Sequence, residues 1–245
     1  MLLSLHLPTC LSLLLWTLLE FPLSLPAEYI DIDPPSQDAL NAEELIKKSD
    51  AVLQSFLAAP NMERFRNNIN KASGVFIVPQ MLRGKFLIGR SGGAGLLLAR
   101  DPDTGTWRHP AFYTLDSVST GLQIGADASE IILLVMTEKG MKAMLSPEFN
   151  ITGQDVSVAA GSVGDEHSRP SADILAFTRS MKGIFGGVFL AGAVITPRPQ
   201  WNKAYYGKPV TVQDILMQHA AGSRRADLLR SRLRDVQSSL ESRRK

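Results

Sequence analysis

The chain has 245 residues, of which 44% are hydrophobic and 20% are charged, proportions typical of a globular protein and not of a disordered one. Its formal net charge at pH 7 is only +2, which is too small to favour a nucleic acid as its partner. The single cysteine, Cys10, lies in the N-terminal segment, so the rest of the chain has no thiol for a disulfide, a zinc site or a nucleophile.

The first 27 residues are rich in leucine, and Glu20 is their only charged side chain. Such a segment predicts a secretory signal peptide over residues 1–27, and hence export to the periplasm or cell envelope, or secretion. A retained membrane anchor is the alternative, but Pro8, Glu20 and Pro22 leave only a short unbroken apolar stretch for a spanning helix. Residues 28–41, which are polar and contain two adjacent prolines, are predicted to be a linker.

A helical pattern begins at Ala42 and ends at Pro60, because apolar side chains recur along one stripe between these residues. Lys47 and Lys48 lie outside this stripe. A second, shorter helix follows and ends near Gly74. The apolar stripe of the first helix consists of Leu45, Val52, Leu53, Phe56 and Leu57.

Beyond this helix pair the chain contains short runs of β-branched, leucine and aromatic residues separated by Gly, Pro and Asp, which predicts strands. Short helices are expected at 138–145 and 213–221. The predicted strands are 75–79, 85–89, 95–100, 111–116, 121–126, 130–136, 155–160, 173–178 and 184–196, with a turn at 101–105.

This order of elements predicts one α+β domain over residues 42–222. We expect N-terminal helices, a glycine-marked and mainly antiparallel sheet that is strongly bent or barrel-like, and C-terminal helices. Residues 183–196 contain the Gly183-x-x-x-Gly187 spacing of paired membrane helices. This stretch is shorter than the roughly 20 residues that span a bilayer, so a buried strand is the better interpretation.

Residues 89–93, GRSGG, match the G-x-S-x-G pattern of the nucleophile elbow in serine hydrolases. An elbow needs a strand before the serine and a long helix after it. Ser91 is instead followed by a short apolar stretch and a turn. Serine hydrolysis is therefore the most distant of the functions that the sequence allows, and no catalytic residue is predicted.

The glycines beside this serine have a steric interpretation. Gly93 and Gly95 are two residues apart and therefore lie on one face of a strand, and Gly121 and Gly125 are placed in the same way around Gln123. A strand that is bare on one face lets another backbone, a side chain or a lipid chain approach closely, or lets a strongly bent sheet close.

Neither a metal nor a cofactor is predicted. Asp165, Glu166, His167 and Asp173 lie near one another in the sequence, but their spacing matches no pattern of metal ligands. The phosphate-binding patterns G-x-G-x-x-G and G-x-x-x-x-G-K-[ST] do not occur in the chain.

Residues 223–245 are predicted to form a basic amphipathic helix, with eight basic and three acidic side chains. Three uses of its apolar stripe are open: docking on the core of its own domain, pairing with another helix in a homo-oligomer, and contact with an anionic membrane surface. The stripe consists of Leu229, Leu233, Val236 and Leu240.

The strands and their glycines resemble the SYLF domain family, in order along residues 42–221. The most specific segments are GLQIG at 121–125, SMKGIFGG at 180–187, and Asn202 followed by YYG at 205–207. Gly92 and Ala94 depart from the family pattern, which has larger or charged residues between the glycines. The positions of the structural motif are Gly93, Gly95, Gly121, Gln123, Gly125, Gly183, Gly187, Gly192, Asn202, Tyr205, Tyr206 and Gly207.

The resemblance implies a lipid-binding domain without catalytic activity. Eukaryotic members, often joined to a Src-homology type domain, bind phosphoinositides and actin, and many bacterial members are exported. The amphipathic N-terminal helix of the eukaryotic members is implicated in membrane contact, and the helix that begins at Ala42 matches it.

We therefore expect an exported, membrane-associated protein that binds anionic phospholipid. An oligomeric scaffold or interaction protein of the cell envelope is the alternative. The candidate lipid-binding residues are Lys47, Lys48, Phe56 and Leu57 in the first helix, Arg179 and Lys182 beside the glycine block, and Arg230, Arg232 and Arg234 in the tail.

Overall fold

The computed structural model describes residues 35–83, 90–118, 129–151, 155–160, 172–180, 190, 192–218 and 220–242. These residues belong to one unit of contacts, which begins at Pro35. The predicted signal peptide and the predicted strands at 85–89 and 121–126 lie outside the described residues. So do Cys10, Gly121, Gln123, Gly125, Asp165, Glu166, His167, Lys182, Gly183 and Gly187.

Two N-terminal helices are present, as predicted, but α1 (Gln37–Ala58) begins five residues before Ala42. Its start is set by Ser36, whose hydroxyl oxygen accepts a hydrogen bond from the Ala39 N–H at 3.3 Å. The first turn is mostly polar, which is why this part of the helix was assigned to the linker. The shorter helix α2 (Glu63–Ile69) follows.

Eight strands form one open, curled sheet in the order β5-β8-β3-β2-β1-β4-β7-β6. Only the pair β6–β7 is parallel, so the prediction of a mainly antiparallel, bent sheet in an α+β domain is confirmed. The strands are β1 (Gly74–Arg83), β2 (Arg90–Ala99), β3 (Ala111–Val118), β4 (Ser129–Val135), β5 (Phe149–Asn150), β6 (Val158–Ala160), β7 (Ile174–Ser180) and β8 (Ala193–Pro197).

The remaining helices follow β4 and β8. α3 (Glu138–Met144) matches its prediction, whereas α4 (Pro199–Tyr206) was not expected. α5 (Val212–Leu216) is shorter than predicted and begins with a capping box formed by Thr211 and Asp214. A single 3₁₀ turn (Arg224–Ala226) leads into the tail helix α6 (Asp227–Ser242).

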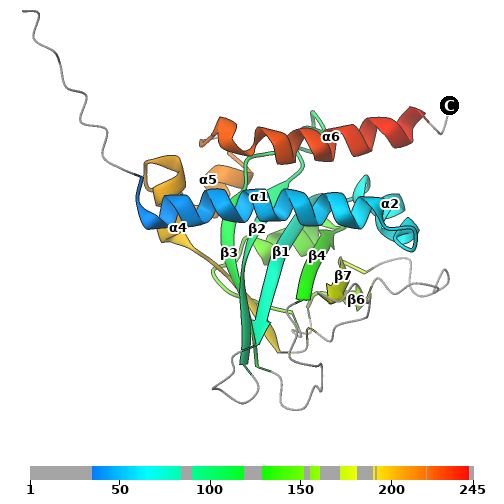
Figure 1. Cartoon of the computed structure of the whole chain (residues 1–245), viewed down its shortest axis with the longest axis horizontal. Helices are drawn as coiled ribbons and strands as arrows, with labels where there is room; N and C mark the ends of the chain where they lie inside the picture. The colour runs from blue at the N-terminus through cyan, green and yellow to red at the C-terminus, as the bar shows by residue number, and fades with distance from the viewer. Residues whose placement is uncertain are drawn as a thin grey trace, which may run out of the picture. The chain divides into compact units, whose positions relative to one another are not determined.

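Hydrophobic cores cover both faces of the sheet, because side chains alternate along each strand. One core joins the sheet to α1, α2, α4 and α6, and the other includes residues of α3 and α5. Figure 1 shows α1 crossing the strands with α6 alongside it. The helix-facing core has an aromatic centre that includes Phe56, Phe65, Phe112, Phe177 and Trp201.

Candidate functional site

A bulge in β1 shapes the centre of the sheet. The pairing of β1 with β2 shifts by one residue between Ile77 and Leu82, and its pairing with β4 shifts within the same stretch. Pro79 lies in this bulge, where its lack of an N–H group is tolerated although β1 is a central strand.

Gly93 and Gly95 of β2 lie against this part of β1. A Cβ atom built on Gly93 would lie 2.5 Å from the carbonyl oxygen of Gln80. One built on Gly95 would lie 2.7 Å from the Phe76 ring and 2.9 Å from a methyl group of Val78. The bare face of β2 is therefore filled by a neighbouring strand of the same sheet.

Ser91 lies inside β2, where its backbone pairs with Arg83 of β1 and with Ser117 of β3. The strand continues without a break to Ala99. A nucleophile elbow needs a sharp turn at the serine and a helix directly after it. The backbone at Ser91 has neither feature.

The motif Asn202 with Tyr205, Tyr206 and Gly207 joins α4 to β3. The side-chain oxygen of Asn202 accepts a hydrogen bond from the Phe112 N–H at 2.9 Å, and the Tyr206 hydroxyl donates one to the Pro110 carbonyl at 2.7 Å. Tyr205 packs edge-on against the Phe112 ring. Gly207 ends α4 with φ of 69°, and the motif residue Gly192 has φ of 72° before β8.

The candidate residues of α1 are divided between its two faces. Lys47 and Lys48 are exposed, and Lys48 is paired with Glu44 at 2.7 Å. Phe56 is fully buried, and Leu57 packs at the edge of the same core. The lysines are therefore exposed, Leu57 is half-buried, and Phe56 is enclosed by the core.

Arg179 holds α1 to the sheet. Its guanidinium donates to Glu130 on the adjacent strand β4 and to the Ser55 hydroxyl of α1, both at 2.6 Å. It also lies 5.2 Å from the centre of the Phe56 ring. These contacts leave the guanidinium largely enclosed, so Arg179 has a structural role in this arrangement.

The described part of the apolar stripe of α6 is directed into its own domain, whereas the side chain of Leu240 lies outside what the structure describes. Leu229 and Leu233 are 0% and 2% exposed in the helix-facing core, and Val236 packs against that core. Of the three uses open from the sequence, the structure has the first, docking on the domain core. A helix pair in a homo-oligomer would have to form without these buried side chains.

Ion pairs link α6 and the preceding turn to α1. The Arg232 guanidinium donates to both carboxylate oxygens of Asp50, at 2.5 and 2.9 Å. Arg225 pairs with Glu43 at 2.8 Å. A two-point contact of this kind fixes the orientation of both groups, so Arg232 is committed to the α1–α6 contact.

Arg230 and Arg234 line the outer side of α6. Arg230 donates to the Trp107 carbonyl at 2.9 Å and pairs with Asp227 at 2.9 Å. The side chain of Arg234 is 72% exposed, and the nearest carboxylate oxygen among the described residues, that of Asp235, is 3.9 Å away. Arg234 is therefore the arginine of the three that is accessible to an external anion.

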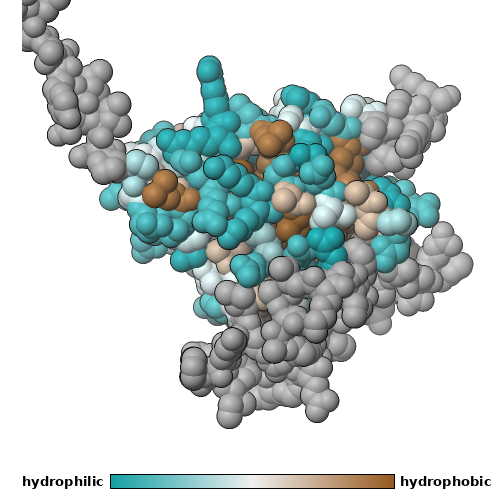
Figure 2. All heavy atoms as spheres, viewed as in Figure 1, coloured by the Kyte–Doolittle hydropathy of each residue, from teal (hydrophilic) through white to brown (hydrophobic). Residues whose placement is uncertain are grey.

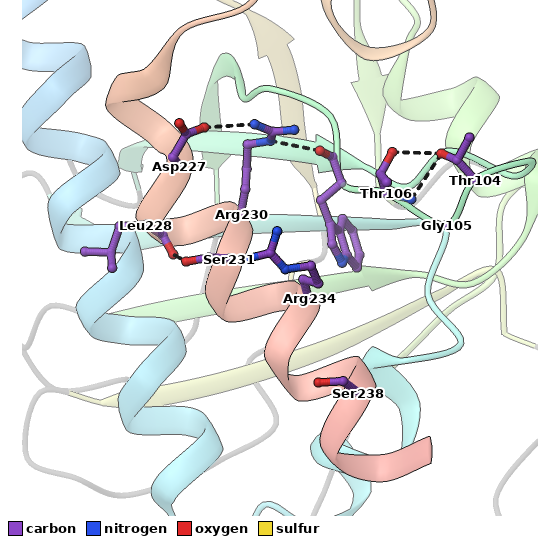
Figure 3. A pocket seen from close by; sticks show the side chains of 10 residues that line it. Thr104, Gly105, Thr106, Asp227, Leu228, Arg230, Ser231, Arg234 and Ser238 are labelled. Carbon is purple, nitrogen blue, oxygen red and sulfur yellow. Dashed lines mark hydrogen bonds and ion pairs between the residues drawn. The ribbon is translucent and has the colours of Figure 1, made fainter. Parts of the chain in front are cut away.

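Two hollows flank α6, and Leu228 and Ser231 border both of them. The larger, about 870 Å³, lies between α6 and the 101–107 turn, with Arg230, Arg234, Thr104 and Thr106 among its lining residues (Figure 3). The smaller, about 450 Å³, lies between α6 and the end of α1. Hollows of this size can accommodate a small ligand or a lipid headgroup.

Leu228 forms an apolar ridge between these hollows and is 65% exposed. Leu228 was not among the predicted site residues because it falls outside the apolar stripe of α6. The available signal was a leucine of the predicted helix on a different face from that stripe. Figure 2 shows the surrounding face as mostly hydrophilic, with small separated apolar patches, so insertion into a bilayer would be shallow.

Within the described residues, no helix is both long and apolar enough to cross a membrane. The same residues contain no group of three or more potential metal ligands. Asp173, from the predicted acidic cluster, instead accepts hydrogen bonds from Thr137 at 2.6 Å and from Ser157 at 2.9 Å. The Thr137 hydroxyl, followed by the Ser157 N–H, lowers the pKa of Asp173.

These features define an α+β domain with a curled sheet between two helical layers and a mixed apolar and cationic ridge on α6. Residues 116–236 match the family model Ysc84, described as Las17-binding protein actin regulator. This match confirms the resemblance to the SYLF domain family seen in the sequence. The match extends into α6, in keeping with the packing of that helix on the core.

Comparison with curated proteins identifies relatives in animals and yeast. The chain is 28% identical over 153 residues to SH3 domain-containing YSC84-like protein 1 of Homo sapiens, covering 60% of this chain and 44% of that protein. It is 27% identical over 198 residues to LAS seventeen-binding protein 3 of Saccharomyces cerevisiae, covering 76% of this chain and 42% of that protein. The chain thus spans less than half the length of these relatives, and the yeast relative is named for binding another protein.

Proposed function

We propose that this chain is an exported, non-catalytic domain that binds the surface of an anionic membrane through the outer side of α6. The observation that carries the proposal is that Leu228, 65% exposed, and Arg234, 72% exposed, both line the larger hollow on α6. An apolar side chain that can enter the interface beside a cation that can meet a headgroup is typical of peripheral membrane contact.

The expected affinity is low. Burial of one leucine contributes about 2 kcal/mol, and each arginine near an anionic surface contributes about 1 kcal/mol. Leu228 with Arg224 and Arg234, which are both exposed, therefore supplies about 4 kcal/mol, equivalent to a dissociation constant of about 1 mM. Ion pairs occupy Arg225, Arg230 and Arg232 and reduce what these three can add.

Co-sedimentation with vesicles of phosphatidylserine and phosphatidylcholine at low salt and millimolar lipid tests this proposal. The wild-type protein is expected to bind these vesicles and to remain unbound with phosphatidylcholine alone. The double substitution Leu228→Ala and Arg234→Gln should weaken binding about a hundredfold, since it removes about 3 kcal/mol of contact.

The matched control is Met217→Ala with Lys203→Gln, which removes an exposed apolar and an exposed basic side chain outside α6. This control should bind as the wild type does. Absence of wild-type binding to the anionic vesicles, or equal loss in both double variants, would contradict the proposal.

A protein partner is the second candidate, because LAS seventeen-binding protein 3 is named for one. The hollows beside Leu228 are open to a protein as well as to a lipid. A protein that binds only such a partner would not co-sediment with the vesicles, although it would be correctly folded.

A further inference from the structure

A third hollow, of about 460 Å³, lies on the helix-facing side of the sheet, away from the α6 ridge. It exists because the sheet has small side chains there. The pairs of β2 and β3 residues along this face are Leu96 with Phe112, then Ala94 with Thr114, then Gly92 with Asp116. Beyond the first, bulky pair, the sheet leaves space under α1 and α4.

Two opposite charges of this hollow are unpaired. Arg198, directly before α4, stacks on the Trp201 ring, with its guanidinium carbon 3.8 Å from the ring centre. Asp116 lies across the bare Cα of Gly92, where a Cβ atom would be 2.7 Å from its carboxylate. Among the residues that the structure describes, neither Arg198 nor Asp116 has an ion-pair partner within 4.0 Å.

The two charges nevertheless influence each other. Burial lowers the pKa of Arg198, and the negative charges of Asp38 and Asp116 oppose this effect. Lys48 and Glu44, at the rim of the hollow, neutralise each other through their own ion pair at 2.7 Å. The lining therefore has one free positive and one free negative group and no net charge.

We propose that this hollow binds a small zwitterion, with an oxyanion on Arg198 and an ammonium group on Asp116. A lone anion would be repelled by Asp116, and a lone cation by Arg198. A guanidinium held on an aromatic ring offers its fork to an oxyanion. Free phosphoethanolamine and the headgroup of phosphatidylethanolamine both carry this chemistry.

NMR titration of the full chain with O-phosphoethanolamine tests the proposal, with the shift of the Trp201 indole resonance as the readout. Saturable binding is expected. Ethyl phosphate, which lacks the ammonium group, and ethanolamine, which lacks the phosphate, should each bind at least about tenfold more weakly, because a charged hydrogen bond contributes about 1.5–3 kcal/mol.

Asp116→Asn and Arg198→Gln should each weaken phosphoethanolamine binding about tenfold, as expected for loss of one charged contact. Asp103→Asn, the same change on an exposed turn, and Arg234→Gln, on the α6 ridge, should leave it unchanged. The Arg234 control also separates this proposal from membrane binding through α6. Equal affinity for ethyl phosphate and phosphoethanolamine, or no effect of Asp116→Asn, would overturn the zwitterion site.

The source of the zwitterion is decided by a second arm. Vesicles of phosphatidylcholine with added phosphatidylethanolamine are compared with phosphatidylcholine alone, using the wild type and Asp116→Asn. Binding that depends on both phosphatidylethanolamine and Asp116 supports a lipid headgroup. Binding of free phosphoethanolamine without this vesicle effect supports a soluble ligand, and failure of both arms refutes the proposal.

Discussion

Gly93 is required where it stands because β1 bulges toward it. The atom nearest to a Cβ on Gly93 is a backbone oxygen, that of Gln80, which can move only if the strand moves. At Gly92 the nearest atom belongs to the carboxylate of Asp116, an exposed side chain that can rotate away. A methyl group added to Gly93 therefore lowers the stability of the fold more than one added to Gly92.

Gly93→Ala is expected to lower the free energy of unfolding by about 1–3 kcal/mol, the usual cost of adding a methyl group to a packed interior. Gly92→Ala is the matched control and should change it by less than about 1 kcal/mol, since the lost chain entropy of glycine offsets the small rearrangement. Urea denaturation followed by circular dichroism measures both. Equal losses in the two variants would show that the bulge does not press on Gly93.

Phe56 and Arg179 show how single residues can have a different role from the one their type suggests. An aromatic side chain on an amphipathic helix and an arginine beside a glycine block are both typical of lipid contact. Here the guanidinium lies near the Phe56 ring and bonds to α1 and β4. Both side chains stabilise the attachment of α1 to the sheet.

At the level of elements, α6 is part of the domain and not an appended tail. Its apolar stripe enters the helix-facing core, and two arginines of this segment pair with acidic residues of α1. Adjacent leucines of the helix therefore have opposite environments. Leu229 is fully buried, while Leu228 is 65% exposed.

Leu229→Ala is expected to lower the free energy of unfolding by about 2–5 kcal/mol, because it removes buried methyl groups and leaves a cavity. Leu228→Ala, one residue earlier, should stay within about 0.5 kcal/mol of the wild type. Thermal and urea denaturation provide the measurement. If α6 were free of the domain in solution, the two substitutions would have the same small effect.

The whole domain has an uneven distribution of charge. Residues 224–242 carry five arginines against Asp227, Asp235 and Glu241, a net charge of +2. The charges within α6 itself cancel, so this excess comes from Arg224 and Arg225 in the turn before the helix, and it directs this end of α6 toward an anionic surface. The short edge strands β5 and β6 leave little exposed edge for pairing with another sheet.

Binding to anionic vesicles is therefore expected to fall as salt rises from 0.1 M to 1 M, because the screening length shortens from about 10 Å to about 3 Å. Vesicles of phosphatidylcholine alone are the control, and the protein should remain unbound with them at every salt concentration. Co-sedimentation over a salt series measures the effect. Binding that persists at 1 M salt would mean that apolar contact, and not the positive charges of residues 224–242, attaches the domain.

Much of the fold could be predicted because it depends on local sequence patterns. Strands such as β1, β4 and β7 appeared as short apolar runs, and the 138–145 helix appeared from its composition. α4 was missed because its sequence, PQWNKAYY, begins with proline and is rich in aromatic residues, a composition that does not favour a helix. The start of α1 was missed because its capping serine lies among prolines and polar residues.

By itself, the sequence determined the α+β class, the family and the apolar face of each long helix, because side-chain periodicity and glycine spacing are local properties. Only the tertiary structure decided what covers those faces. The same stripe on α6 suits a core, a second helix or a membrane, and its burial against α1 selects the first. The exposed ridge of Leu228 and the unpaired charges of Arg198 and Asp116 arise only when distant segments pack together.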